Sequence, residues 1–98
     1  MVCKENLEKV KNILDSWNET NDGREAISKE FKFLDFKEAF SFISMIALKS
    51  EQINHHPELY NVYNKVKIVL TTHDVDGLSL KDIELGKFID DSYKRFNK

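Results

Sequence analysis

The segment AISKEFKFLDFKEAFSFISMIALKSEQIN, residues 26–54, changes from the periodicity of a strand to that of a helix. From residue 26 to residue 33 the side chains alternate between two faces, with Ile27, Lys29, Phe31 and Phe33 on one and Ser28, Glu30 and Lys32 on the other. This alternation predicts a strand over Ala26–Phe33 with one face in water. Asp35 follows, with Glu38 in the position of a capping-box partner, so a helix is expected to begin there.

The predicted helix carries one apolar stripe, formed by Phe36, Ala39, Phe40, Ile43 and Ala47, with Ile46 beside it. We interpret these phenylalanines as core packing rather than as an aromatic binding box. Pro57 disfavours the α conformation at His56, so the helix is expected to end by Asn54–His55.

Two shorter elements are predicted before this segment. Apolar residues recur at helical spacing over residues 4–15, which predicts an amphipathic helix with Leu7, Val10, Ile13 and Leu14 on its apolar face. A short strand is expected around Trp17–Thr20. Asn21-Asp22-Gly23 is typical of a turn between that strand and the next.

Two strands and a helix are predicted after Pro57. Leu59–Tyr63 and Lys65–Thr72 have the character of strands joined by a tight turn near Asn64. Gly77 interrupts the chain, and Ser79 with Asp82 predicts the start of a last helix. The apolar residues of that helix are Leu85, Phe88, Ile89, Tyr93 and Phe96.

The order of elements is therefore helix, strand, strand, helix, strand, strand, helix. Short hairpin connections imply antiparallel pairing, and helices gathered on one face give two layers. We predict an α+β fold in which three helices pack on one face of a four-stranded antiparallel sheet. A chain of 98 residues has room for one core, so residues 1–98 are expected to form a single domain.

Composition and charge exclude several classes of function. The net charge of −2 provides no basic field for direct contact with nucleic acid. No apolar run approaches the roughly 18 residues of a membrane span, and the first residues lack the apolar core of a signal peptide. Cys3 is the only cysteine, which excludes an internal disulfide and a thiolate cluster. The expected location is the cytoplasm.

The chain has three histidines, and they suggest proton transfer. His55 and His56 are adjacent at the predicted helix end, and His73 follows a predicted strand. The helix dipole favours a charged imidazole at a C-terminal end by about 0.3–1 kcal/mol. Glu51 lies four residues before His55 on the same helical face, so we expect its carboxylate to hold that ring. One charged and one neutral histidine would suit acid–base catalysis.

A metal site is the competing interpretation, because three histidines can ligate a catalytic zinc ion. The side chains of His55 and His56 diverge in either a helix or a strand, and no His-x-x-x-His pair is present. We therefore expect no metal at these residues. A zinc hydrolase stays as an alternative hypothesis. Elemental analysis for zinc and the sensitivity of any activity to chelators would test it.

The spacing of these residues resembles a known family. Glu51-x-x-x-His55-His56-Pro57 is followed by Tyr63, His73 and Asp82, which is similar to the signature of pterin-4a-carbinolamine dehydratases. The resemblance continues through most of the chain, in residues 23–27, 31–36, 61–66 and 72–79. It implies a hydro-lyase, a 4a-hydroxytetrahydrobiopterin dehydratase, that converts 4a-hydroxytetrahydropterin to quinonoid dihydropterin in tetrahydrobiopterin recycling.

The resemblance also implies roles for individual residues, and it implies neither a metal nor an organic cofactor. His55 and His73 would be the principal acid–base groups, with the assignment of acid and base left open. His56 would join them, and Glu51 would bind or orient the pterin. Four more residues are expected beside the pterin, namely Trp17, Asn54, Thr71 and Thr72. Asn54 departs from the family, since many members carry aspartate before the histidine pair.

A second hypothesis from the same resemblance is a non-catalytic module. Some animal members of the family act as dimerisation cofactors of a homeodomain transcription factor. Family members also join sheet edges and pack helices together, so a homodimer or homotetramer is expected. The free edges of a small sheet make such association physically reasonable.

Overall fold

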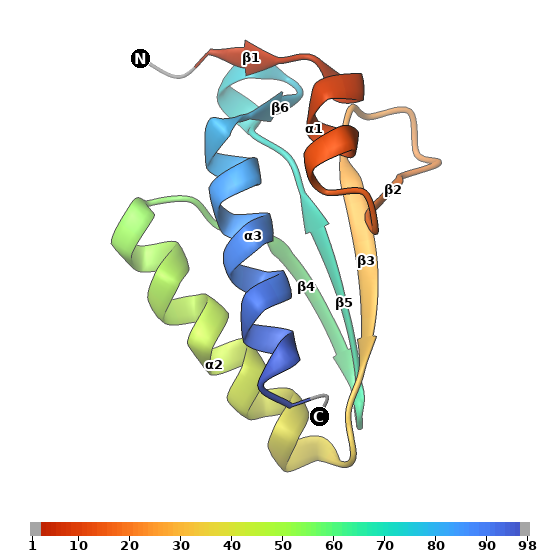
Figure 1. Cartoon of the computed structure of the whole chain (residues 1–98), viewed down its shortest axis with the longest axis vertical. Helices are drawn as coiled ribbons and strands as arrows, with labels where there is room; N and C mark the ends of the chain where they lie inside the picture. The colour runs from red at the N-terminus through yellow and green to blue at the C-terminus, as the bar shows by residue number, and fades with distance from the viewer. Residues whose placement is uncertain (1–2, 97–98) are drawn as a thin grey trace.

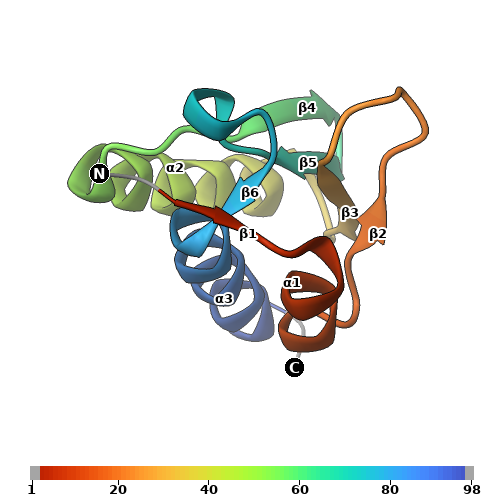
Figure 2. The same cartoon turned by 90° about the horizontal axis from the view of Figure 1, so that it is seen from above.

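A four-stranded antiparallel sheet with strand order β2-β3-β5-β4 forms one layer of the molecule. The computed structural model describes residues 3–96. The strands are β2 (Asn18–Glu19), β3 (Ile27–Lys32), β4 (Glu58–Val62) and β5 (Lys65–Leu70). The helices are α1 (Leu7–Ile13), α2 (Phe36–Ile53) and α3 (Leu80–Lys94). All three helices lie on the same face of the sheet (Figures 1 and 2), which confirms the predicted α+β fold.

The structure adds a second, smaller sheet that the sequence did not predict. Strand β1 (Lys4–Glu5) pairs antiparallel with β6 (Leu78–Ser79), and a 3-10 turn, η1 (His73–Val75), precedes β6. The predicted helix over residues 4–15 was therefore too long at its start. Asn6 caps α1 by accepting bonds from the backbone N–H groups of Glu8 and Lys9, so the chain before Asn6 is free to pair as a strand.

Strand β3 places its apolar side chains against the helices, as predicted. Its pairing with β5 sets Ile27 opposite Leu70 and Phe31 opposite Val66, and all four residues are buried. The ring of Phe31 lies 5.1 Å from that of Phe42 of α2, measured between centroids. Aromatic pairs at such distances and burial of this apolar area hold the sheet and helix layers together.

The buried face of α2 differs from the predicted stripe. Four residues of α2 are buried, namely Ala39, Phe42, Ile46 and Ser50. Phe36 and Phe40, predicted to be buried, are 49% and 54% exposed, and Ala47 is also exposed. Apolar residues occur all around this helix, so its sequence fits a buried stripe through Phe36 and Phe40 as well as one through Phe42. Phe42 is chosen because its ring packs against aromatic rings from β3 and α3, a contact that only the tertiary fold creates.

Two predicted helix limits, the end of α2 and the start of α3, are confirmed. Asn54 adopts a left-handed conformation with φ of 53°, and its N–H donates to the carbonyl of Ser50, which ends α2. Ser79 caps α3 in a complete capping box with Asp82. No helix within residues 3–96 combines the length and the apolar character that a membrane span requires.

Gly86 marks the closest approach of α3 to its neighbours. A Cβ atom at this position would lie 2.5 Å from Cδ1 of Leu14 and 3.3 Å from Cδ1 of Leu70. Both leucines are buried, so their side chains have little room to move away. Glycine has a low helix propensity, and its presence at position 86 is explained by the lack of space for a larger side chain.

We expect Gly86→Val to lower the free energy of unfolding by about 1–3 kcal/mol, because its side chain overpacks the contact with Leu14. The control is Lys87→Val at the next, exposed position of α3, with an expected change within about 0.5 kcal/mol. Urea denaturation of both variants measures the difference. Equal stabilities would show that the contact at Gly86 yields without cost.

Candidate active site

Polar side chains gather where α2 ends, β4 begins, β5 runs into η1 and α3 begins. These segments lie in the upper half of the molecule as drawn in Figure 1. The left-handed cap at Asn54 turns the chain out of α2, so His55 leaves the helical path and points toward the first turn of α3. His55 and His56 lie in the connection between α2 and β4, and His73 is the first residue of η1.

His55 pairs with a carboxylate that differs from the one predicted. Its Nε2 lies 2.6 Å from Oδ1 of Asp82, and the histidine is only 8% exposed. Glu51, which we expected to hold His55, instead contacts His56, with Oε2 and Nε2 2.5 Å apart on the surface. The expectation was wrong because it assumed helical geometry through residue 55, whereas the helix ends two residues earlier.

Asp82 is completely buried, and both of its carboxylate oxygens are used. Besides His55, it accepts bonds from the Thr72 hydroxyl at 2.6 Å and from the Ser79 N–H at 3.0 Å. The hydroxyls of Thr72 and Ser79 lie 2.7 Å apart. A buried carboxylate is tolerated only when such partners replace water. Asp82 therefore joins the end of α2, the end of β5 and the start of α3.

His73 has a contrasting environment. It is exposed at the start of η1, and no side-chain hydrogen bond of His73 is found within residues 3–96. A surface hollow of about 270 Å³ is lined by Gly23, Arg24, Glu25, Thr71, His73 and Asp76. The Thr71 hydroxyl lies 3.0 Å from the carbonyl oxygen of Glu25 and 3.2 Å from that of Gly77. The hollow thus brings together two predicted site residues, His73 and Thr71.

The other predicted site residues have structural positions. Trp17 is 1% exposed, packs edge-to-face against Phe31, and donates its indole N–H to Asp90 at 3.1 Å. This core position does not support its expected place in a pterin pocket. Asn54 is the left-handed cap of α2, and its carbonyl accepts a long bond of 3.5 Å from Lys81. Asparagine adopts the left-handed backbone conformation more readily than most residues, so Asn54 has a structural role in ending α2.

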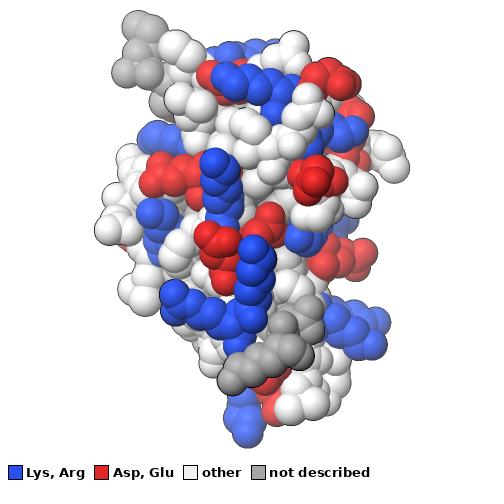
Figure 3. Space-filling view, viewed as in Figure 1, with Lys and Arg blue, Asp and Glu red and all other residues white. Residues whose placement is uncertain are grey.

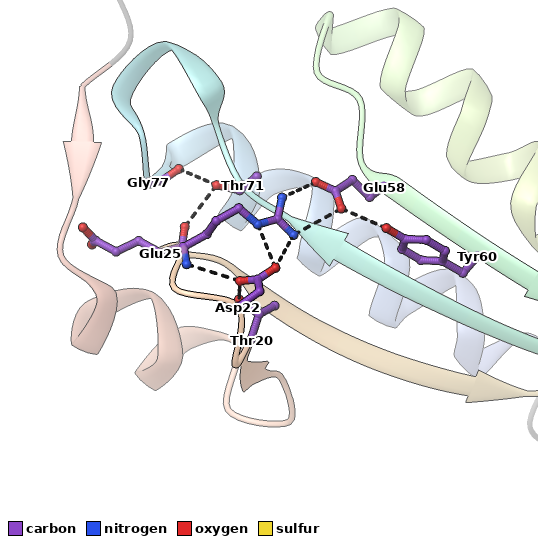
Figure 4. A network of polar contacts seen from close by, with 8 residues as sticks. Thr20, Asp22, Glu25, Glu58, Tyr60, Thr71 and Gly77 are labelled. Atoms are coloured by element: carbon purple, nitrogen blue, oxygen red, sulfur yellow. Dashed lines mark hydrogen bonds and ion pairs between the residues drawn. The ribbon is translucent and has the colours of Figure 1, made fainter.

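An ion-pair network beside the hollow was missed by the sequence analysis. The Arg24 guanidinium contacts both Asp22 and Glu58 (Figure 4). Hydrogen bonds from Arg24 are the main reason that the pKa values of both carboxyls lie below their usual range, and these carboxylates in turn raise the pKa of Arg24. Asn21-Asp22-Gly23 was interpreted only as a turn. Nothing in the sequence shows that this turn reaches residue 58.

The described residues offer no arrangement suited to a bound metal ion. Within residues 3–96 no group of three or more histidine, cysteine, aspartate or glutamate side chains is placed to hold one. On the face of the molecule shown in Figure 3, lysine and arginine alternate with aspartate and glutamate, so no stripe of one charge covers that face.

Comparisons with known proteins agree on one family. The family model described as pterin 4 alpha carbinolamine dehydratase matches residues 3–92. A protein of Burkholderia cenocepacia (strain HI2424), named "Putative pterin-4-alpha-carbinolamine dehydratase", is 56% identical over 68 residues, which are 69% of this chain and 67% of that protein. A relative of the same name from Burkholderia vietnamiensis (strain G4 / LMG 22486) is 54% identical over 68 residues, which again are 69% of this chain and 67% of that protein.

A solved structure is also similar over nearly the whole chain. It is described as the crystal structure of a transcriptional coactivator/pterin dehydratase from Brucella melitensis. The TM-score is 0.87 at 36% sequence identity, and the match covers 93% of this chain and 99% of that one. The similarity therefore extends to the arrangement of all the main elements.

We expect Asp82→Ala to lower the free energy of unfolding by about 2–4 kcal/mol, because it leaves His55 and Thr72 without their buried partner and removes the capping-box partner of Ser79 at the start of α3. The control is Asp91→Ala, at an exposed position of the same helix, with an expected loss within about 0.5 kcal/mol. Denaturant titration compares them. Similar losses for both variants would contradict a central role for Asp82.

Proposed function

The chain belongs to the pterin 4 alpha carbinolamine dehydratase family, and from this premise we propose that it dehydrates 4a-hydroxytetrahydropterin to quinonoid dihydropterin by histidine acid–base catalysis. The observation that carries the proposal is the His55–Asp82 pair in the same end of the molecule as His73. The family match supplies the substrate class. The geometry supplies groups that can move protons.

The reaction is an elimination of water. An acid protonates the 4a-hydroxyl group, the bond between C4a and oxygen breaks, and the electron pair on N5 forms the double bond between N5 and C4a. A base then removes the proton from N5, so one proton is delivered and one is taken away. No electron leaves the pterin. Positioned side chains that donate and accept protons contribute about 10²–10⁴-fold to such steps.

The Asp82 carboxylate supports a catalytic role for His55 through orientation. It binds Nε2, so the ring is held in one orientation and Nδ1 is the nitrogen left for a proton of the substrate. A buried carboxylate behind a histidine also stabilises the charge that the ring gains when it takes up a proton, as in catalytic triads. The bonds from Thr72 and Ser79 keep that carboxylate in place.

His73 and the surface pair of His56 and Glu51 complete the proposed site. We assign His73 as the second proton-transfer group, because it is exposed and lines the hollow that also holds Thr71. His56 and Glu51 hold each other in place beside His55 and serve to orient the pterin. Reaction in the cytoplasm stays a prediction from the sequence.

The direct test is the loss of the 4a-carbinolamine absorbance in a coupled assay with an aromatic amino acid hydroxylase. Purified protein should accelerate this loss above the spontaneous rate. His55→Ala and His73→Ala should each lower kcat/KM by about 10²–10⁴-fold, because each removes one proton-transfer group. Asp91→Ala, on an exposed part of α3, serves as the control and should keep wild-type activity.

Two results would contradict the proposal. The first is a wild-type protein that does not exceed the spontaneous rate. The second is acceleration that is unchanged in both histidine variants. A dihydropterin soaked into crystals should lie between His55 and His73, which tests the location independently of the rate.

A second candidate function is a protein-binding module on the same fold. The observation that favours it is the description of the Brucella structure, which names both a coactivator and a dehydratase. A stoichiometric regulator recovered with the protein, together with normal biological function of His55→Ala, would favour this function over catalysis.

We also propose that the chain forms a homodimer or homotetramer. Three large apolar side chains of α2 face solvent, with Phe36 49%, Phe40 54% and Leu48 76% exposed. Large exposed apolar patches often mark protein contacts. The rings of Phe36 and Phe40 lie 5.7 Å apart, so these two side chains form one apolar patch.

We expect light scattering coupled to size exclusion to give a mass of two or four times the 11.5 kDa chain. Phe40→Glu should shift the population toward the monomer, because it places a charge in the apolar contact. Lys87→Glu, at an exposed position of α3 outside this face, is the control and should leave the mass unchanged. A wild-type monomer at high micromolar concentration would contradict the proposal.

A further inference from the structure

Arg24 is held between two carboxylates from different parts of the chain. Its Nε donates to Oδ2 of Asp22 at 2.8 Å, and its two terminal nitrogens lie 2.5 and 3.3 Å from the two oxygens of Glu58. A guanidinium group presents donors in a fixed fork that matches two carboxylates in this way. A lysine at the same position offers one point charge and does not reproduce the fork.

The network joins the loop between β2 and β3 to both histidine-bearing segments. Glu58 is the first residue of β4 and directly follows His55-His56-Pro57. On the other side of the loop, the carbonyl of Glu25 accepts from the hydroxyl of Thr71, which lies two residues before His73. Figure 4 shows these attachments, with Asp22 and Glu25 on the loop itself and with Glu58 from β4 and Thr71 from the end of β5 reaching it.

Arg24 and His73 share the same surface hollow. The charge of His73 also contributes to lowering the pKa of Glu58, although the hydrogen bond from Arg24 is the largest cause. Arg24 is therefore bound to Glu58 and lines the same hollow as His73.

The exposure of the network argues against a main role in holding the fold together. The side chains of Arg24, Asp22 and Glu58 are 39%, 45% and 30% exposed. Ion pairs with this much contact with water contribute little to global stability, because solvent screens them and their side chains lose freedom. Ordering three such side chains costs conformational entropy. Because the network gains little global stability in return, we look for its role in the local geometry of the site.

We propose that Arg24 is a positioning residue of the site, which holds the His55–Glu58 segment and the loop bearing His73 at a fixed separation by joining Asp22 to Glu58. Its role in catalysis rests on the proposed dehydratase function, whereas its role in geometry does not. Arg24 acts through Glu58 and through its own loop, not by contact with the reacting atoms.

The kinetic test compares Arg24→Ala, Arg24→Lys and Glu58→Gln in the carbinolamine assay. We expect Arg24→Ala to lower kcat by about 10–100-fold with KM changed less than about threefold, since small misplacements of catalytic groups have effects of this size. Arg24→Lys should recover little of the loss. The double variant Arg24→Ala, Glu58→Gln should lose no more than Arg24→Ala alone, because the two residues act as one unit.

Arg95→Ala is the matched control, because it removes the only other arginine, which is exposed near the end of α3. It should leave kcat and KM unchanged. The midpoint of thermal unfolding of Arg24→Ala should fall by less than about 4 °C, as expected for a surface ion pair. A large rise in KM at unchanged kcat would instead make Arg24 a substrate-binding residue and overturn the proposal, as would wild-type kinetics of Arg24→Ala.

The geometric role is tested separately by NMR of the three imidazole rings. In Arg24→Ala the signals of His56 and His73 should shift or broaden by exchange, while that of the buried His55 keeps its position; Arg95→Ala should change none of them. Unchanged His73 signals in Arg24→Ala would overturn the positioning role whatever the rate data show. An inactive wild-type protein with the expected NMR changes would reject the dehydratase function and retain the positioning role.

Discussion

The hydrogen bonds of the buried Asp82 carboxylate are the interactions on which the arrangement of the candidate site depends. Water does not reach it, and its two oxygens are bound by His55, Thr72 and the N–H of Ser79. The three partners come from the connection after α2, the end of β5 and the start of α3. A buried charge without these partners is costly, so the end of α2, the end of β5 and the start of α3 are held together by the same requirement.

The two attachments of the site differ in their physical character. Asp82 is shielded from water, where hydrogen bonds are strong and the loss of one partner lowers the free energy of unfolding markedly. Arg24 works at the surface, where solvent screens its ion pairs. The first attachment makes His55 a rigid, shielded group, and the second lies beside His73, which is exposed.

Local signals in the sequence were sufficient for most of the fold. Asp35 and Ser79 begin helices where their side chains can accept backbone N–H bonds, and Asn54 with Pro57 ends the long helix. The alternation in Ala26–Phe33 identified the buried face of β3. The same signals failed at the short β1–β6 pair, because two-residue strands have no periodicity to detect. They also failed on α2, where the predicted stripe included Phe36 and Phe40 but not Phe42, the phenylalanine of this helix that is buried.

The sequence by itself determined the order of the main elements, the limits of α2, the start of α3 and the family, and it pointed to the three histidines for the proposed chemistry. These depend on periodicity, caps and motif spacing, which act between residues close along the chain. Only the tertiary structure decided that His55 meets Asp82, 27 residues away, and that Arg24 meets Glu58, 34 residues away. Such partners are chosen by how helices and loops pack, because a side chain binds whatever carboxylate the fold brings within reach, not the one nearest in sequence.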